Sequence, residues 1–121
     1  MKYNMSWLDK KSYETRYNCD EIYILFSDDD NYFEKGVIVT ENTARFIIRN
    51  IDSIVKEDDY VVSNDGPDPV CINWSIDRNV VVVEFIDDST TIMLTNEMML
   101  QFQTDIMKLL SGYTTKISRI D

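Results

Sequence analysis

The side chains that could do chemistry in this chain are mainly carboxylates, and two runs of three stand out: Asp28, Asp29 and Asp30, and Glu57, Asp58 and Asp59. The first run begins like a calcium-binding loop, Asp-x-Asp. Tyr32 and Phe33 then stand where that loop needs another oxygen ligand and a glycine. Together the two runs could hold a divalent cation only if the fold brought them into contact. We expect no metal and no cofactor.

Other kinds of active site find little support in the composition. The chain has no histidine, which removes the commonest general base and the usual partner of a serine or cysteine nucleophile. With three glycines in all, it lacks a glycine-rich loop for phosphate. Cys19 and Cys71 have no metal-binding or redox spacing, so free thiols are favoured over a single disulfide. We therefore expect a protein that is not an enzyme.

The charge of the chain points to a particular kind of partner. There are 22 Asp and Glu residues against 12 Lys and Arg, for a formal net charge of -10. Binding to nucleic acid requires clustered basic side chains, so direct contact with it is not expected. A protein with a basic surface is the better partner. No apolar run approaches the roughly 18 residues of a membrane span, and no signal peptide is evident, so we expect a cytoplasmic protein with no membrane contact.

Two helices are predicted from apolar periodicity. Residues 41–56 place apolar side chains at helical spacing behind Thr40, a plausible N-cap, although a β-hairpin turning at 41–43 is an alternative. Residues 96–111 follow Thr95 in the same way and lead to Gly112, which suits the end of a helix. The second helix also has an additional apolar stripe, which predicts a contact surface for another subunit or for the N-terminal arm. Its expected residues are Leu100, Gln103 and Met107.

Strands are expected at 21–26, 32–39, 60–62, 70–76, 80–86 and 90–94, where β-branched and aromatic residues lie between turn signals. Gly36 within the second of these indicates either a bulge or a close backbone approach. The fold class is therefore α+β, with an antiparallel sheet of five to six strands and two helices on one face. A length of 121 residues fits a single domain, 1–121.

An internal repeat organises this domain. A shift of 55 residues places Thr40 on Thr95 and aligns the apolar positions of the two helices. This predicts tandem ββα units at 21–58 and 79–112, with an N-terminal arm at 1–20 and a hairpin arm at 60–76. In a ββα unit, the turn between the strands and the end of the helix are expected at the same end. The two acidic runs would then form one acidic pole.

The leading functional hypothesis is a small, acidic, non-catalytic inhibitor or adaptor that binds a basic surface through this acidic pole. A nucleic-acid mimic encoded by a phage or mobile element as a counter-defence protein is one form of this hypothesis, by analogy of class alone. The alternative is a homo-oligomer, at its simplest a homodimer through residues 96–111, which binds a small molecule between subunits. A metal-dependent hydrolase is the third hypothesis. Turns favour aspartate for local reasons, so the acidic runs also have an explanation without function.

Overall fold

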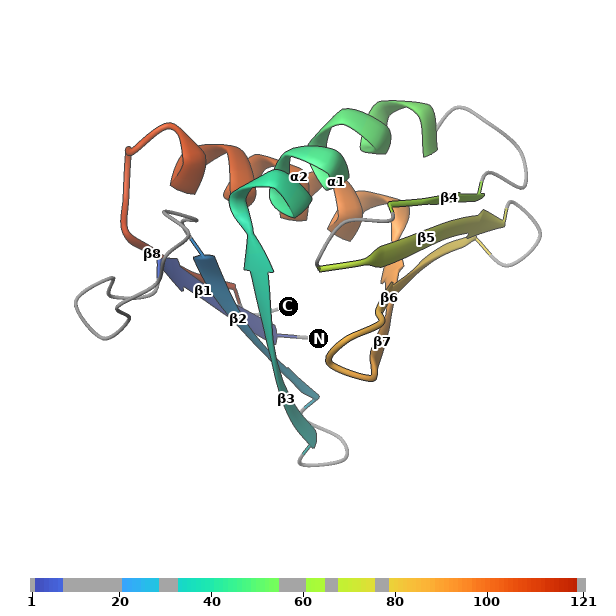
Figure 1. Ribbon diagram of the computed structural model, residues 1–121, viewed down its shortest axis with the longest axis horizontal. Helices are drawn as coiled ribbons and strands as arrows, with labels where there is room; N and C mark the ends of the chain where they lie inside the picture. Colours follow the sequence, from blue (N-terminus) through green and yellow to red (C-terminus); the bar gives the residue numbers. More distant parts are fainter. Residues whose placement is uncertain are drawn as a thin grey trace.

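A computed structural model describes residues 2–7, 21–28, 33–54, 61–64, 68–75 and 79–119 of the chain. Eight strands and two helices follow one another in this part, as labelled in Figure 1: β1 (Lys2–Trp7), β2 (Glu21–Asp28), β3 (Phe33–Thr40), α1 (Glu41–Ile54), β4 (Val61–Ser63), β5 (Val70–Ser75), β6 (Val80–Phe85), β7 (Thr90–Thr95), α2 (Asn96–Leu110) and β8 (Lys116–Arg119). The predicted α+β class is confirmed, and so are both predicted helices. The hairpin alternative for residues 41–56 is wrong, because 41–54 are helical.

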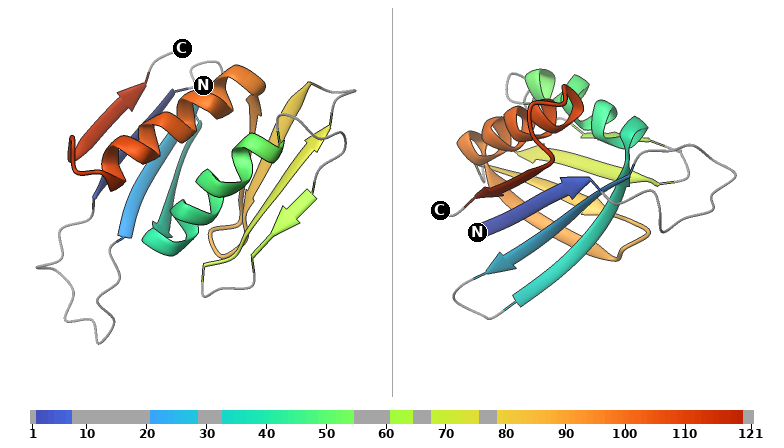
Figure 2. Two further views of the ribbon diagram at one scale, coloured as in Figure 1. Left: turned by 90° about the horizontal axis from the view of Figure 1, so that it is seen from above. Right: turned by 90° about the vertical axis from the view of Figure 1, so that its left-hand side faces the viewer.

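The strands form two antiparallel sheets of four strands, in the orders β3-β2-β1-β8 and β4-β5-β6-β7. The single sheet of five to six strands predicted from the sequence is therefore wrong. The two sheets spread apart below the helices (Figure 1), and α1 and α2 lie side by side in opposite directions across them (Figure 2). Local periodicity identifies a strand but not its neighbours, so the division into two sheets could not be predicted from the sequence.

Each half of the chain is a βββαβ unit, one strand longer at each end than the predicted ββα repeat. The last strand of each unit joins the sheet of the other unit: β4 extends the sheet of β5–β7, and β8 extends the sheet of β1–β3. The 55-residue shift continues beyond the helices, since β4 starts at Val61 and β8 at Lys116. The two units are thus related by an exchange of strands.

The strand registers of the two sheets correspond pair by pair. Glu21 faces Thr40 in the first sheet, and Val80 faces Thr95 in the second. Trp7 faces Ile22, and Trp74 faces Val81. The exchanged strands obey the same rule, because Ser6 faces Lys116 and Asn73 faces Val61. A twofold rotation about an axis between α1 and α2, vertical in Figure 1, therefore relates the two halves.

The N-terminal segment is part of the sheet and not an arm over the core. β1 lies between β2 and β8, with the side chains of Tyr3 and Met5 buried and that of Trp7 half-buried. The expected arm at 1–20 is thus wrong for residues 2–7, and residues 8–20 lie outside the described part. The period-two alternation of Tyr3, Met5 and Trp7 with polar residues is the signal that identifies this strand.

The hydrophobic core lies where the inner faces of the two sheets meet the helices. Tyr3, Phe26 and Phe102 join β1, β2 and α2, with ring centroids 5.4 to 6.3 Å apart. Phe85 of β6 lies 5.9 Å from Phe26, so an aromatic contact also connects the two sheets. Full burial of such side chains stabilises a fold by about 1.5 to 3 kcal/mol each. One aromatic cluster therefore holds all three layers together.

Capping interactions fix the ends of the helices as the sequence predicted. The Thr40 and Thr95 hydroxyls accept hydrogen bonds from the backbone N–H of Thr43 and Met98, each at 3.2 Å. Gly112 takes a φ of 79° after α2, and the backbone N–H of Tyr113 donates to the carbonyl of Lys108 at 3.2 Å. Glycine is favoured at this position because it adopts a positive φ without steric cost, and the bond back to the Lys108 carbonyl then closes the end of the helix.

Gly36 marks a close approach and not a bulge, because the pairing of β2 with β3 is continuous from Glu21 to Asp28. A Cβ atom at Gly36 would meet the hydroxyl of Tyr23 and would lie 2.8 Å from its Cε2 and Cζ atoms. The ring of Tyr23 thus lies across the glycine on the outer face of the first sheet, and a side chain at position 36 would displace it.

Candidate functional site

The residues of the predicted acidic pole fall mostly outside the described part of the chain. Asp28 is the last residue of β2, whereas Asp29, Asp30 and Glu57 to Asp59 are not described. The end of β2 and the end of α1, which precede the two runs, lie on opposite sides of the molecule in Figure 1. The union of both runs in one pole stays a prediction, and the flanking elements do not favour it. The calcium-like Asp28-x-Asp30 also extends outside the described part.

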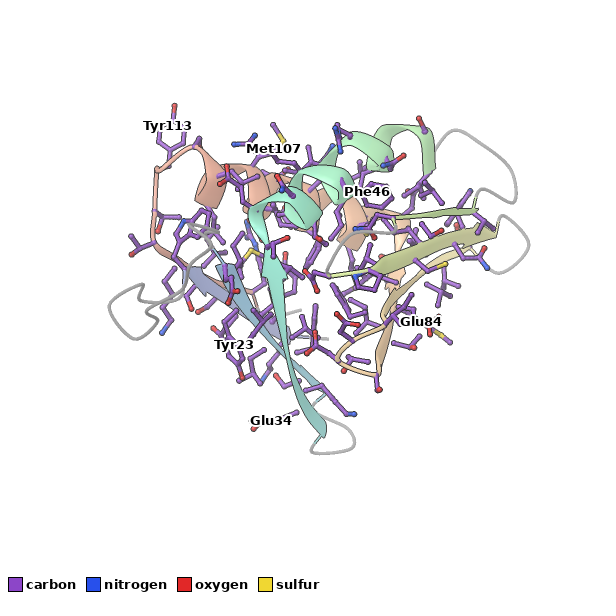
Figure 3. The ribbon with its side chains drawn as sticks, viewed as in Figure 1. Tyr23, Glu34, Phe46, Glu84, Met107 and Tyr113 are labelled. Carbon is purple, nitrogen blue, oxygen red and sulfur yellow. The ribbon has the colours of Figure 1, made fainter. Side chains whose placement is uncertain are left out.

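A different acidic arrangement emerges from the twofold relation. The hairpins β2–β3 and β6–β7 are equivalent, and both point away from the helices in Figure 1. Phe26-Ser27-Asp28-Asp29 at the first corresponds in sequence to Phe85-Ile86-Asp87-Asp88 at the second. We call these the acidic hairpin ends. Two further carboxylates, Glu34 on β3 and Glu84 on β6, are exposed on the same lower half of the molecule (Figure 3).

Asp68 adds a carboxylate close to the second hairpin end. Its Oδ2 atom accepts a hydrogen bond from the backbone N–H of Thr40 at 3.0 Å, and its backbone carbonyl accepts one from the Thr43 hydroxyl at 2.9 Å. Burial raises the pKa of Asp68; the backbone N–H of Thr40 and the side-chain hydroxyl of Thr43 oppose this shift, while the charges of Asp88 and Asp87 add to it. Asp68 therefore holds the segment before β5 against the start of α1. The sequence suggested only a turn here.

Asp105 is the one fully buried carboxylate in the described part of the chain. It accepts two hydrogen bonds from the Arg119 guanidinium, at 2.8 and 2.9 Å, one from the Tyr3 hydroxyl at 2.6 Å and one from the Gln101 side chain at 3.2 Å. Burial opposes the charge, but the bonds from Arg119 and Tyr3 outweigh it, so the pKa of Asp105 lies below its ordinary value. This cluster ties β1, α2 and β8 together.

The role of this cluster is positional, and sequence reasoning missed it. Arg119 is 35% exposed, but its charge is satisfied by the carboxylate behind it, and the pKa of the guanidinium is raised above its ordinary value mainly by that bond. The signal available in the sequence was the position of Asp105 next to the core face of α2, where an unpaired charge would be costly. A buried acid next to a core stripe implies a basic partner from another element.

The predicted oligomer contact residues of α2 divide into two groups. Leu100 is 40% exposed and Met107 is 51% exposed, so the predicted apolar stripe does face solvent. Gln103 is different, because its Nε2 donates a hydrogen bond of 3.1 Å to the carbonyl of Ile48 in α1. Tyr113, just after α2, is 86% exposed. Figure 3 shows Met107 and Tyr113 on the outer side of the helices.

The predictions on metal binding, cysteines and membrane contact can be compared with the described residues only. Among the described residues, no three His, Cys, Asp or Glu side chains are grouped so as to share a metal ion. Cys71 is a free, half-buried thiol, and Cys19 lies outside the described part. Neither α1 nor α2 has the length and apolar character needed to cross a bilayer. Comparison of the chain with protein-family models, curated proteins and solved structures gives no match.

Proposed function

We propose that this protein is a non-catalytic inhibitor or adaptor that binds a basic surface of a partner protein through its acidic hairpin ends. The observation that carries the proposal is their equivalence: the β2–β3 and β6–β7 hairpins are related by the twofold rotation and point to the side away from the helices. In the sequence, two consecutive aspartates follow the corresponding segments Phe26-Ser27 and Phe85-Ile86. Local turn preference explains one aspartate pair, but it does not require a pair at both ends.

The charge of the chain favours such a partner. A net charge of -10 gives long-range attraction toward a basic surface, which speeds association and makes it sensitive to salt. The described cations on the helices, Arg45, Arg49 and Lys108, lie on the other side of the molecule from the hairpin ends. The helices also carry Glu41 and Glu97, and Lys2 and Lys35 lie near the end of the β2–β3 hairpin. The proposal therefore depends on the aspartates of the acidic hairpin ends and not on a division of charge between two sides of the molecule. A partner that normally binds nucleic acid fits this chemistry, so we keep the nucleic-acid mimic as its specific form.

The test is capture of the partner from a lysate of the source cells at low and high salt, followed by affinity measurements with the purified partner. The double variants Asp28→Asn/Asp29→Asn and Asp87→Asn/Asp88→Asn should each weaken binding about tenfold at low salt, with a smaller effect at high salt. The matched control, Glu21→Gln/Glu41→Gln, neutralises two carboxylates at the opposite end of the β2–β3 hairpin, next to the start of α1, and should bind like the parent.

A third double variant, Asp58→Asn/Asp59→Asn, separates the hairpin ends from the acidic pole predicted from the sequence. If it weakens binding as much as the hairpin variants, the partner also contacts the end of α1. Unchanged affinity in both hairpin variants would refute the proposal. Displacement of the captured partner by duplex DNA would support the nucleic-acid mimic, and simultaneous binding of DNA and this protein would contradict it.

A further inference from the structure

We propose that the outer face of α2 forms a homodimer, in which the α2 helices of two copies pack antiparallel. The interface would lie on the side of the molecule away from the acidic hairpin ends. It therefore leaves those ends free, and it does not depend on their function.

The stripe that would form the contact has defined limits. Leu100 and Met107 are seven residues apart, two helical turns, and the exposed Thr104 and Ser111 continue the same line. One flank of α2 contacts α1 through the Gln103 bond to Ile48, and the other flank contacts β8 through Asp105. This stripe is thus the side of α2 that stays open to solvent in the described part of the chain.

The twofold relation shows that the fold itself does not need an apolar stripe at this place. The α1 positions equivalent to Leu100, Thr104 and Met107 are Arg45, Arg49 and Asp52. Arg45 is exposed and bonds to Glu41 at 2.7 Å, as is ordinary for a helix surface. At these equivalent positions the sequence of α1 has three charged residues, whereas that of α2 has two apolar residues and a threonine. Exposed apolar side chains on one face of a helix, bordered by polar residues, are typical of contact surfaces.

The charges beside the stripe identify a second copy as the occupant. Glu97 and Lys108 are both exposed and lie on the same flank of the stripe, near its two ends. The pair Leu100 and Met107 and the pair Glu97 and Lys108 are centred on the same turn of α2. In an antiparallel arrangement, Leu100 of each copy therefore contacts Met107 of the other, and Glu97 of each copy faces Lys108 of the other. A twofold interface requires such self-complementarity.

The experiment uses charge reversal with light scattering and sedimentation over a wide range of protein concentration. The parent should show a reversible rise from the 14.2 kDa monomer toward twice that mass. Glu97→Lys alone and Lys108→Glu alone should each weaken the dimer about tenfold or more, because like charges then face each other twice. A mixture of the two variants should form a heterodimer, since every facing pair is again opposite in charge.

The controls are Glu84→Lys and Lys116→Glu, which make the same charge changes on exposed positions of the sheets and should dimerise like the parent. Met107→Glu should give a monomer with the far-ultraviolet circular dichroism of the parent. A parent that stays monomeric at high concentration would overturn the proposal. So would a dimer that both single reversals leave intact, or a mixture of the two variants that forms no heterodimer.

Discussion

The Nε2 atom of Gln103 in α2 donates a hydrogen bond of 3.1 Å to the backbone carbonyl of Ile48 in α1, and these two residues occupy equivalent positions in the two halves of the chain. The 55-residue shift that places Thr40 on Thr95 also places Ile48 on Gln103. A residue that contacts its own equivalent must lie next to the rotation axis. The bond therefore locates the twofold axis of the molecule between these two residues.

Gln103→Ala should lower the free energy of unfolding by about 1 kcal/mol, since one bond between the helices is lost and the carbonyl of Ile48 keeps its place in the α1 helix. Urea denaturation measures this change. Thr104→Ala, on the exposed outer face of the same helix, serves as the control and should have a smaller effect. The oligomeric state should not respond to Gln103→Ala. A change in mass would place Gln103 in an interface between subunits, as the sequence had predicted.

Arg119→Leu should destabilise the protein by about 2 kcal/mol, because it leaves the buried carboxylate of Asp105 without its cation. Breaking a fully buried pair costs about 3 to 5 kcal/mol, and the partial exposure of Arg119 lowers that figure. Asp105→Asn/Arg119→Leu should recover part of the loss, since no buried charge then remains. Lys116→Leu, at an exposed position of the same strand, is the control in urea denaturation. Equal effects of the two leucine variants would contradict the prediction.

The contributions of Asp105 and Asp68 to the free energy of unfolding should change in opposite directions as the pH changes. The pKa of Asp105 is below 3.8 in the folded protein, so its stabilisation is present above 3.8 and is lost as the pH falls through the folded pKa. The pKa of Asp68 is above 3.8, so its contribution is present below 3.8 and is lost as the pH rises through the folded pKa.

Urea denaturation at a series of pH values between about 2 and 7 tests this pair. Relative to the parent, Asp105→Asn should become less stable as the pH rises, whereas Asp68→Asn should become more stable. Parallel pH profiles for the two variants would refute the assignment. Each variant is the control for the other, because the same chemical change is made in two environments.

Gly36→Ala should destabilise the protein by about 1 kcal/mol, because its Cβ would displace the ring of Tyr23. In a double-mutant cycle, Tyr23→Ala/Gly36→Ala should lose less stability than the sum of the single variants, by about 0.5 to 1 kcal/mol. Gly112→Ala is the matched control. It has a positive φ and no atom within 4 Å of its Cβ position, so it should lose stability through the backbone alone and show no coupling to Tyr23.

Trp7 and Trp74 occupy equivalent places in the two sheets and can report on each half separately. In Trp7→Phe, the fluorescence of Trp74 follows the second sheet, and in Trp74→Phe that of Trp7 follows the first. In both variants we expect the fluorescence transition in urea to coincide with the loss of circular dichroism, because each sheet contains a strand of the other half. A fluorescence transition that precedes the loss of helix in either variant would contradict this.

The sequence predicted those features that depend on neighbouring residues. Thr95 caps α2, Gly112 ends it, and apolar spacing gave both helices, because each of these signals acts within a few residues. The prediction of a single sheet was wrong, since the pairing of β8 with β1 joins residues more than a hundred positions apart. The N-terminal strand was missed although Tyr3, Met5 and Trp7 alternate with polar residues.

The candidate site shows the same limit. The stripe of Leu100 and Met107 could be recognised because helical periodicity alone separates it from the core face. The bond of Gln103 to the carbonyl of Ile48 was missed, because this partner is known only once the two helices are set side by side. The acidic runs were visible in the sequence, but which of them share a side of the molecule depends on the direction in which each hairpin points, and periodicity carries no information about that.

The exchange of β4 and β8 also bears on what the two halves would be as separate chains. A fragment cut between β4 and β5 would carry a strand belonging to the other fragment's sheet and would lack one of its own. A lone βββαβ fragment is therefore incomplete, yet a second copy of the same fragment could supply its missing strand by reciprocal swapping. The chain thus has the form of a strand-swapped pair of subunits contained in a single polypeptide.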